Sequence, residues 1–212
     1  TSKSDYGDSI VKLGPISGGT FPVLDWFTPY NQNSLSGGDT DVGSGGLVLL
    51  PDLPQGSAHQ QLLTQIGKEG KMYVVDRNNM GKFCSTCTSA DTQIVQEVPG
   101  ATAGIWGAPA YWNGFVYWGG GNDGGGPSPL KAFSFNANGS GLISTSPVSQ
   151  TAKAFGFSTP VPSISANGSA NGILWGLDDS AFGSSCCQVL YAYDATNLGT
   201  MLYNSSQAAG SR

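Results

Sequence analysis

Paired aspartates in two short polar segments are the residues of this chain with the clearest capacity for chemistry. Asp39 and Asp41 are separated by one threonine, and Asp178 and Asp179 are adjacent. Their carboxylates could bind a hard cation such as Ca²⁺, which takes about six to eight oxygen ligands in loose geometry. Asp39 and Asp41 are therefore the candidate metal ligands. The plainer interpretation is a pair of solvated turns, because aspartate accepts hydrogen bonds from turn backbone.

Four cysteines fall into two local pairs, Cys84 with Cys87 and Cys186 with Cys187. The first spacing predicts a small loop disulfide, since a zinc site would need a second pair of ligands at suitable spacing. The adjacent cysteines could close a small, strained disulfide ring. A structural clamp, a redox or inter-chain role and a cofactor contact all stay open for that pair.

Composition excludes several other classes of function. The net charge of −5 and only nine Lys and Arg residues, never clustered, argue against a nucleic-acid partner. No apolar run approaches the roughly 20 residues of a membrane-spanning helix. His59 has no recognisable nucleophile arrangement around it, which argues against a hydrolytic triad. The cysteine pairs, the low charge and three Asn-x-Ser/Thr sequons favour an extracytoplasmic protein, that is, secreted, periplasmic or on the cell surface.

The elements that must position these residues are predicted to be strands. Thirty-two Gly and 12 Pro with 11% charged residues indicate an all-β protein with many tight turns. Three segments starting at Asp76, Ser134 and Asp194 share one frame, a small polar residue with Gly five places on, at steps of 58 and 60 residues. A long fixed period indicates stacked or radially arranged units.

Each unit is predicted to hold four short antiparallel strands, apolar on both faces in the central ones. The predicted strands are 9–13 and 23–27; 46–50, 62–66, 72–76 and 94–98; 107–111, 114–118, 130–135 and 141–146; and 160–164, 172–176, 189–194 and 201–204. This pattern predicts a single, partial β-propeller domain of about three and a half blades. Its blades are 1–32 (half), 43–99, 104–148 and 158–206.

Connections in such a blade alternate between two rims, so the loops entering each blade share a rim with the loops joining strands two and three. Binding sites of propellers are expected on such a rim, where loops from several blades converge. Trp106 could stack there on a sugar or quinone ring. The candidate rim residues are Trp106, Asn122, Asp123, Phe155, Phe157, Asp178 and Asp179.

The segment from Ala192 to Tyr203 resembles the repeat of quinoprotein-like propellers, approximately Ala-x-Asp-x-x-x-Gly-x-x-x-Trp. The segment 67–77 resembles the hairpin between strands two and three in that family, and the likeness spans residues 45 to 206. Tyr203 stands where the docking Trp is usual, and Ser134 replaces the Asp of the middle unit. Such propellers normally close with about seven or eight blades. The resemblance therefore implies that further blades of a longer polypeptide, or partner copies, complete the ring; the alternative is a domain that ends in an unusual cap.

Three functions remain open at this point. The first is a secreted, quinoprotein-like scaffold for binding or assembly, without catalysis of its own. The resemblance also implies a dehydrogenase of alcohols or sugars that carries pyrroloquinoline quinone and Ca²⁺. Quinoprotein alcohol dehydrogenases set a ring of adjacent cysteines against that cofactor, although their pair precedes the first strand of a blade. The third is a structural subunit of an extracellular filament or surface layer, which predicts self-association. A small-molecule or sugar ligand is compatible with the first two.

Overall fold

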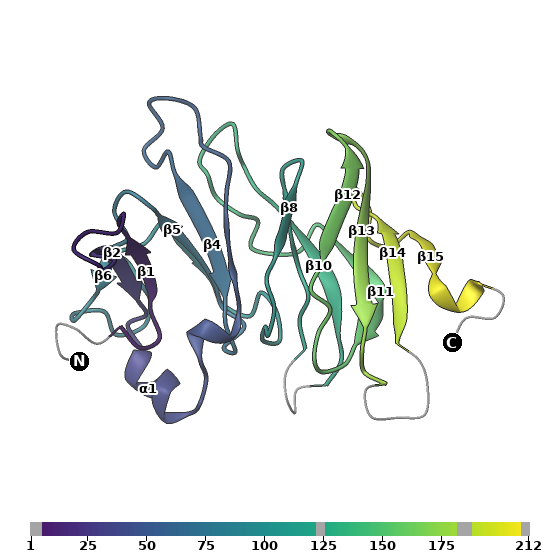
Figure 1. Ribbon diagram of the computed structural model, residues 1–212, viewed down its shortest axis with the longest axis horizontal. Helices are drawn as coiled ribbons and strands as arrows, with labels where there is room; N and C mark the ends of the chain where they lie inside the picture. The colour runs from purple at the N-terminus through teal and green to yellow at the C-terminus, as the bar shows by residue number, and fades with distance from the viewer. Residues whose placement is uncertain (1–5, 122–125, 182–187, 209–212) are drawn as a thin grey trace.

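The computed structural model describes residues 6–121, 126–181 and 188–208, and over these residues the protein is all-β with one short helix (Figure 1). Its strands are β1 (Ile10–Leu13), β2 (Val23–Thr28), β3 (Leu47–Leu49), β4 (Leu62–Ile66), β5 (Met72–Asp76), β6 (Lys82–Phe83), β7 (Gln96–Val98), β8 (Ala110–Trp112), β9 (Phe115–Trp118), β10 (Ser128–Ser134), β11 (Ser149–Phe155), β12 (Ser163–Asn167), β13 (Ala170–Asp178), β14 (Val189–Asp194) and β15 (Met201–Asn204). The helix α1 spans Gln32–Gly37, and single 3₁₀ turns occupy Val42–Ser44 and Ser205–Gln207.

The strands form four sheets that follow one another along the chain. The second, third and fourth sheets each hold four antiparallel strands, in the orders β3-β4-β5-β7, β8-β9-β10-β11 and β12-β13-β14-β15. The first sheet has the order β1-β2-β6, and its two-residue strand β6 pairs in parallel with β2. The prediction of an all-β fold with four-stranded antiparallel units is thus confirmed for three of the sheets.

Both faces of the two middle sheets are buried, because successive side chains of a strand point to opposite faces. In β4, Leu62 and Ile66 pack toward the third sheet, whereas Leu63 packs toward the first. In β9, Val116 packs toward the second sheet and Tyr117 toward the fourth. Three hydrophobic clusters therefore hold the four sheets together, one at each interface.

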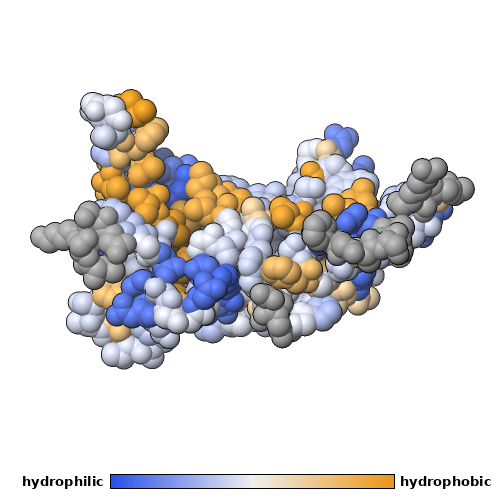
Figure 2. Space-filling view, turned by 60° about the horizontal axis from the view of Figure 1, so that its bottom comes forward, coloured by the Kyte–Doolittle hydropathy of each residue, from blue (hydrophilic) through white to orange (hydrophobic). Residues whose placement is uncertain are grey.

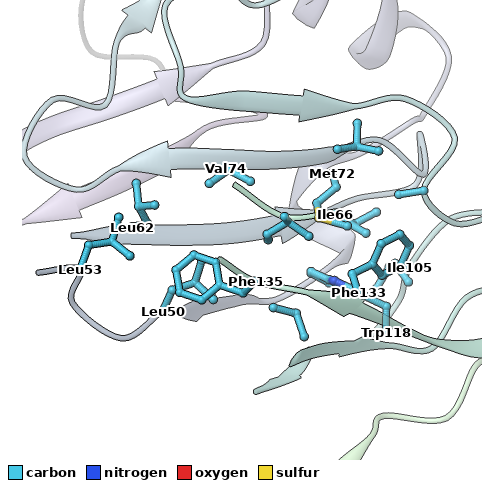
Figure 3. Close-up of a cluster of buried hydrophobic side chains, with 14 residues drawn as sticks. Leu50, Leu53, Leu62, Ile66, Met72, Val74, Ile105, Trp118, Phe133 and Phe135 are labelled. Atoms are coloured by element: carbon cyan, nitrogen blue, oxygen red, sulfur yellow. The ribbon is translucent and has the colours of Figure 1, made fainter. Parts of the chain in front are cut away.

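The largest cluster lies between the second and third sheets (Figure 3). Trp118 and Phe133 from β9 and β10 face Met72 and Val74 of β5 and are fully buried. Full burial of one such aliphatic or aromatic side chain contributes on the order of 1.5–3 kcal/mol. This interface is therefore the main apolar core of the described chain.

Several predicted strands have the observed bounds, including 62–66, 72–76, 189–194 and 201–204. The strand predicted at 141–146 is wrong, because the fourth strand of the third sheet is β11, which starts beyond residue 148. Residues 139–142 instead fold back on Asn136 in a turn, with Gly141 in the left-handed region at φ 71°. Phe155, predicted in a loop, is consequently the last residue of β11 and is buried.

The first sheet contains an element that the sequence pattern did not predict. Strand β6 comes from the segment between β5 and β7 and reaches back to β2.

Within residues 6–121, 126–181 and 188–208, no helix is long and apolar enough to span a bilayer.

Candidate functional site

One end of the sheets brings several predicted rim residues together. Trp106, in the segment before β8, makes an edge-to-face contact with Phe157, at 5.2 Å between ring centroids and an interplanar angle of 86°. Phe157 remains half exposed, and Trp106 is partly exposed. The helix α1 and the end of β13 both lie at the lower end of the molecule in Figure 1. An exposed aromatic pair of this kind offers an apolar surface on which a flat or sugar ring could stack.

Lys153 of β11 links two of the predicted residues beside this pair. Its Nζ lies 2.8 Å from Oδ2 of Asp178, and it also lies over the rings of Phe155 and Tyr191, at 5.0 and 5.3 Å from their centroids. Phe155 and Tyr191 themselves meet edge to face at 5.5 Å. We call Lys153, Phe155, Asp178 and Tyr191 the Lys153 cluster.

The partners of Asp178 keep it ionised. Burial by itself would raise the pKa of Asp178, but the hydrogen bonds from Lys153 and Ser180 outweigh burial and lower it. Ser180 donates from its hydroxyl at 2.6 Å and from its backbone N–H at 3.2 Å to Oδ1 of Asp178. The neighbouring Asp179 accepts a hydrogen bond from the hydroxyl of Ser158 at 3.0 Å. Asp178 and Asp179 therefore bind different partners.

The predicted calcium ligands Asp39 and Asp41 both face one lysine. Lys68 Nζ lies 3.2 Å from Oδ2 of Asp39 and 2.6 Å from Oδ2 of Asp41. The hydrogen bond with Asp41 is the main reason that the pKa of Lys68 is raised. Among the residues that the structure describes, no three Asp, Glu, His or Cys side chains are grouped so as to hold a metal ion. The donor set on the described residues thus does not fit the calcium site of a quinone-dependent dehydrogenase.

A second lysine, which the sequence analysis missed, lies in a more buried cluster. Lys71 follows the β4–β5 turn and lies between two tyrosine rings, at 5.2 Å from the centroid of Tyr30 and 5.7 Å from that of Tyr73. Two carboxylates flank its Nζ, Glu69 at 3.5 Å and Glu97 at 3.8 Å. We call these residues, together with Asp91, the Lys71 cluster.

The hydrogen bonds of the Lys71 cluster tie three segments of the chain together. Tyr73 donates its hydroxyl to Oε2 of Glu69 at 2.9 Å, and Asn31, the N-cap residue that precedes α1, donates its amide to Oε1 of the same carboxylate. Burial, followed by the charge of Glu69, raises the pKa of Tyr73, so this hydroxyl stays a donor. The cluster thereby fixes α1 against the β4–β5 turn.

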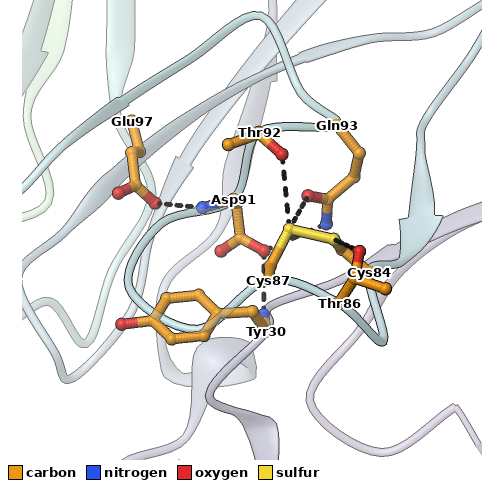
Figure 4. The surroundings of a disulfide bond; sticks show 8 residues. All are labelled: Tyr30, Cys84, Thr86, Cys87, Asp91, Thr92, Gln93 and Glu97. Atoms are coloured by element: carbon orange, nitrogen blue, oxygen red, sulfur yellow. Dashed lines mark hydrogen bonds between the residues drawn. A yellow bond between two sulfur atoms is a disulfide. The ribbon is translucent and has the colours of Figure 1, made fainter.

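Asp91 is the most buried acid of the Lys71 cluster (Figure 4). Its Oδ1 accepts hydrogen bonds from the backbone N–H of Tyr30 at 2.8 Å and from the amide of Gln93 at 3.0 Å. In the described part of the chain its Oδ2 is buried without a partner. Burial raises the pKa of Asp91 by more than these two hydrogen bonds lower it.

The disulfide predicted between Cys84 and Cys87 is present and lies next to Asp91 (Figure 4). Sγ of Cys87 lies 3.3 Å from the hydroxyl of Thr92 and 3.6 Å from Oε1 of Gln93, the residue that binds Asp91. The cross-linked loop therefore supports the Asp91 side of the Lys71 cluster.

Other predicted residues either lie elsewhere or cannot be placed. Asn122, Asp123, Cys186 and Cys187 lie outside the described residues. His59 contacts Asp76, with 2.9 Å between Nδ1 and Oδ2, and belongs to neither cluster.

Part of what was missed carried a sequence signal. Lys153 and Phe155 are two residues apart in one strand, which places them on one face of it.

Comparisons with protein-family models, with curated proteins and with solved structures found no match for this chain.

Proposed function

We propose that this protein is a non-catalytic scaffold for binding or assembly, built as part of a quinoprotein-like β-propeller and working outside the cytoplasm. The observation that carries the proposal is the outer face of the fourth sheet. Cross-strand partners place Leu177 beside Leu190 and Ala192 beside Tyr203, on the face opposite the buried Leu174 and Tyr193. Leu177, Leu190 and Tyr203 are exposed, and Trp175 of the same face is partly so.

The other interfaces of the molecule indicate what would cover this face. The corresponding faces of the second and third sheets carry similar apolar residues, and each is covered by the next sheet. An apolar face of this kind is a typical interaction site. A further four-stranded sheet, from more of the same polypeptide or from a partner, would bury it in the same way and would extend the series of blades toward a ring.

Two further observations support parts of the proposal. The disulfide between Cys84 and Cys87 is typical of an oxidising, extracytoplasmic compartment. The half-exposed Phe157 and the partly exposed Trp106 provide a place for a small ligand or sugar on the proposed rim. The described carboxylates offer no group that would hold Ca²⁺, so the dehydrogenase alternative gains no support from their geometry.

Sedimentation velocity over a range of protein concentrations tests the proposal. The wild-type chain is expected to associate as concentration rises, because the outer face of the fourth sheet is apolar and open. The double variant Leu177→Lys/Leu190→Lys should remain monomeric. The matched control is Leu142→Lys, since Leu142 is an equally exposed leucine outside that sheet, and it should associate like the wild type.

Two results would count against the scaffold. One is a wild-type chain that stays monomeric at high concentration. The other is turnover, measured by dye reduction with alcohols or aldose sugars after addition of pyrroloquinoline quinone and Ca²⁺, which would favour the dehydrogenase.

A further inference from the structure

The first and second sheets enclose an apolar cleft of about 350 Å³ where their edge strands β1 and β3 part. This volume lies at the lower end of the range of small-molecule pockets, roughly 300–1,000 Å³. Its apolar lining consists of Ile10 and Val11 of β1, Leu47 and Leu49 of β3, Leu63 of β4, and Met80. Figure 2 shows a hollow on one face of the molecule with a largely apolar wall.

The cleft continues an interface that is already formed. Ile10, Leu63 and Met80 also belong to the hydrophobic cluster that joins the first sheet to the second. Leu47 and Leu49 lie two residues apart on β3, hence on one face, and they remain 42% and 54% exposed. The interface between these two sheets is thus closed at one side and open along β3.

The edges of the two sheets indicate what is missing. Within the described residues, strand β1 has a neighbour only on its β2 side, because the first sheet has the order β1-β2-β6. The free side of an edge strand presents unpaired N–H and C=O groups that can pair with another strand. Between the third and fourth sheets the corresponding edge strands, β8 and β12, contact each other. Among the described residues, no strand of the first sheet covers Leu47 and Leu49 in the corresponding way.

The two basic residues of the cleft do not make it an anion site. Lys12 Nζ donates to the backbone carbonyl of Arg77 at 2.7 Å, and Arg77 Nη2 lies 3.0 Å from Oδ1 of Asp52. Arg77 Nε is buried and has no partner among the described residues. It is a donor that a backbone carbonyl could satisfy, in keeping with an incoming strand.

We propose that the cleft is the docking site of a partner β-hairpin, which adds two antiparallel strands to the free edge of β1 and packs alternate apolar side chains on Leu47 and Leu49. This inference rests on the proposed scaffold function and gives it a second, distinct contact surface. Backbone pairing along β1 supplies affinity, and the apolar cleft selects hairpins with apolar residues at every second position.

Binding of a synthetic hairpin tests this docking site. The probe is a backbone-cyclised hairpin of about 14 residues with Val and Thr at alternate positions. Its control has the same side chains but carries N-methyl groups on the outward amides of both strands, so that neither edge can donate hydrogen bonds. Titration of the wild-type chain by calorimetry should show saturable binding of the probe and at least tenfold weaker binding of the methylated control.

Variants of the chain test whether the hairpin binds at the cleft. Leu49→Lys should weaken binding of the hairpin at least tenfold, whereas Leu190→Lys on the outer face of the fourth sheet should leave it unchanged. Equal binding of the methylated hairpin, or no saturable binding to the wild type, would overturn the proposal. So would loss of binding in Leu190→Lys, or a homodimer of the wild type that Leu49→Lys abolishes, since a second copy would then occupy the cleft. The scaffold could fail its own sedimentation test independently, because that test uses Leu177 and Leu190.

Discussion

The Lys71 and Lys153 clusters contain the same kinds of group in different surroundings. Each places a lysine over two aromatic rings with at least one carboxylate at its Nζ. The side chain of Lys71 is 8% exposed, whereas that of Lys153 is 32% exposed. Lys71 is shared by Glu69 and Glu97 with Asp91 nearby, whereas Lys153 has one close carboxylate partner, Asp178, in the part of the chain that the structure describes.

The pKa values of Asp91 and Asp178, one acid from each cluster, are shifted in opposite directions. Burial raises the pKa of Asp91 by more than its hydrogen bonds from Gln93 and Tyr30 lower it, and its Oδ2 has no partner in the described structure. The pKa of Asp178 is lowered, because the hydrogen bonds from Lys153 and Ser180 outweigh its burial. The difference shows that the local partners of a carboxylate, and not the fold as a whole, decide whether its ionised form is stabilised. We expect the Lys71 cluster to serve structure and the Lys153 cluster to be the more available for ligands.

Replacing Lys71 should have the largest effect. Lys71→Met leaves the buried Asp91 and the partly buried Glu69 and Glu97 without a cation, and removal of one partner from a buried charge group typically costs about 3–5 kcal/mol. The free energy of unfolding, from urea denaturation at neutral pH, should fall by about that amount. A loss below about 1 kcal/mol would show that the cluster is more hydrated than the burial of its side chains indicates.

Removing the disulfide should have the next largest effect. The double variant Cys84→Ser/Cys87→Ser opens a loop with a sequence separation of only three residues. The chain-entropy estimate for so short a loop is about 2 kcal/mol. Thermal unfolding should show this loss, and hydrogen exchange should show faster opening of residues 84–93 beside Asp91. The exchange rate of β14, in the fourth sheet, is the internal control and should not change.

The contrast between the clusters also explains what could be predicted from the sequence. Strands β4, β5 and β14 were predicted with their observed bounds, because each is a compact apolar run between turn residues. Strand β11 was missed because its sequence, Ser149 to Phe155, is mostly polar or small and is recognisable only by its pairing with β10.

The same reasoning applies to the rim. Trp106 and Phe157 come from two separate segments and are in contact through their rings, and their role at a rim stays a prediction. The Lys71 cluster could not be predicted, because Tyr30, Lys71 and Asp91 come from three separate segments. Neither the parallel pairing of β6 nor the position of α1 follows from any local pattern, and both help to bring these segments together.

Replacing Lys153 should cost less than replacing Lys71. Lys153→Met retains apolar contact with Phe155 and Tyr191, and the ion pair that it loses is partly exposed, where such pairs contribute roughly 0–1 kcal/mol. We expect a loss of about 1 kcal/mol in urea denaturation. A loss equal to that of Lys71→Met would erase the distinction between a structural and an available cluster.

The smallest effects, and the sharpest test of the comparison, concern pH. The folded-state pKa of Asp91 is raised above its ordinary value of 3.8, so the unfolded chain releases this proton first as pH rises. Its contribution to stability is therefore complete below pH 3.8 and is lost as pH rises through the folded pKa.

For Asp178 the sign is reversed. Its folded pKa lies below 3.8, so its contribution is present above that pH and is lost as pH falls through the folded pKa. Asp91→Asn should thus flatten the decline in unfolding free energy above pH 3.8, and Asp178→Asn should flatten the decline below it. Urea denaturation from pH 2.5 to 7 measures both slopes. If the two substitutions changed the same limb of the profile, the two carboxylates would share one electrostatic environment, and the separation of the Lys71 and Lys153 clusters would not hold.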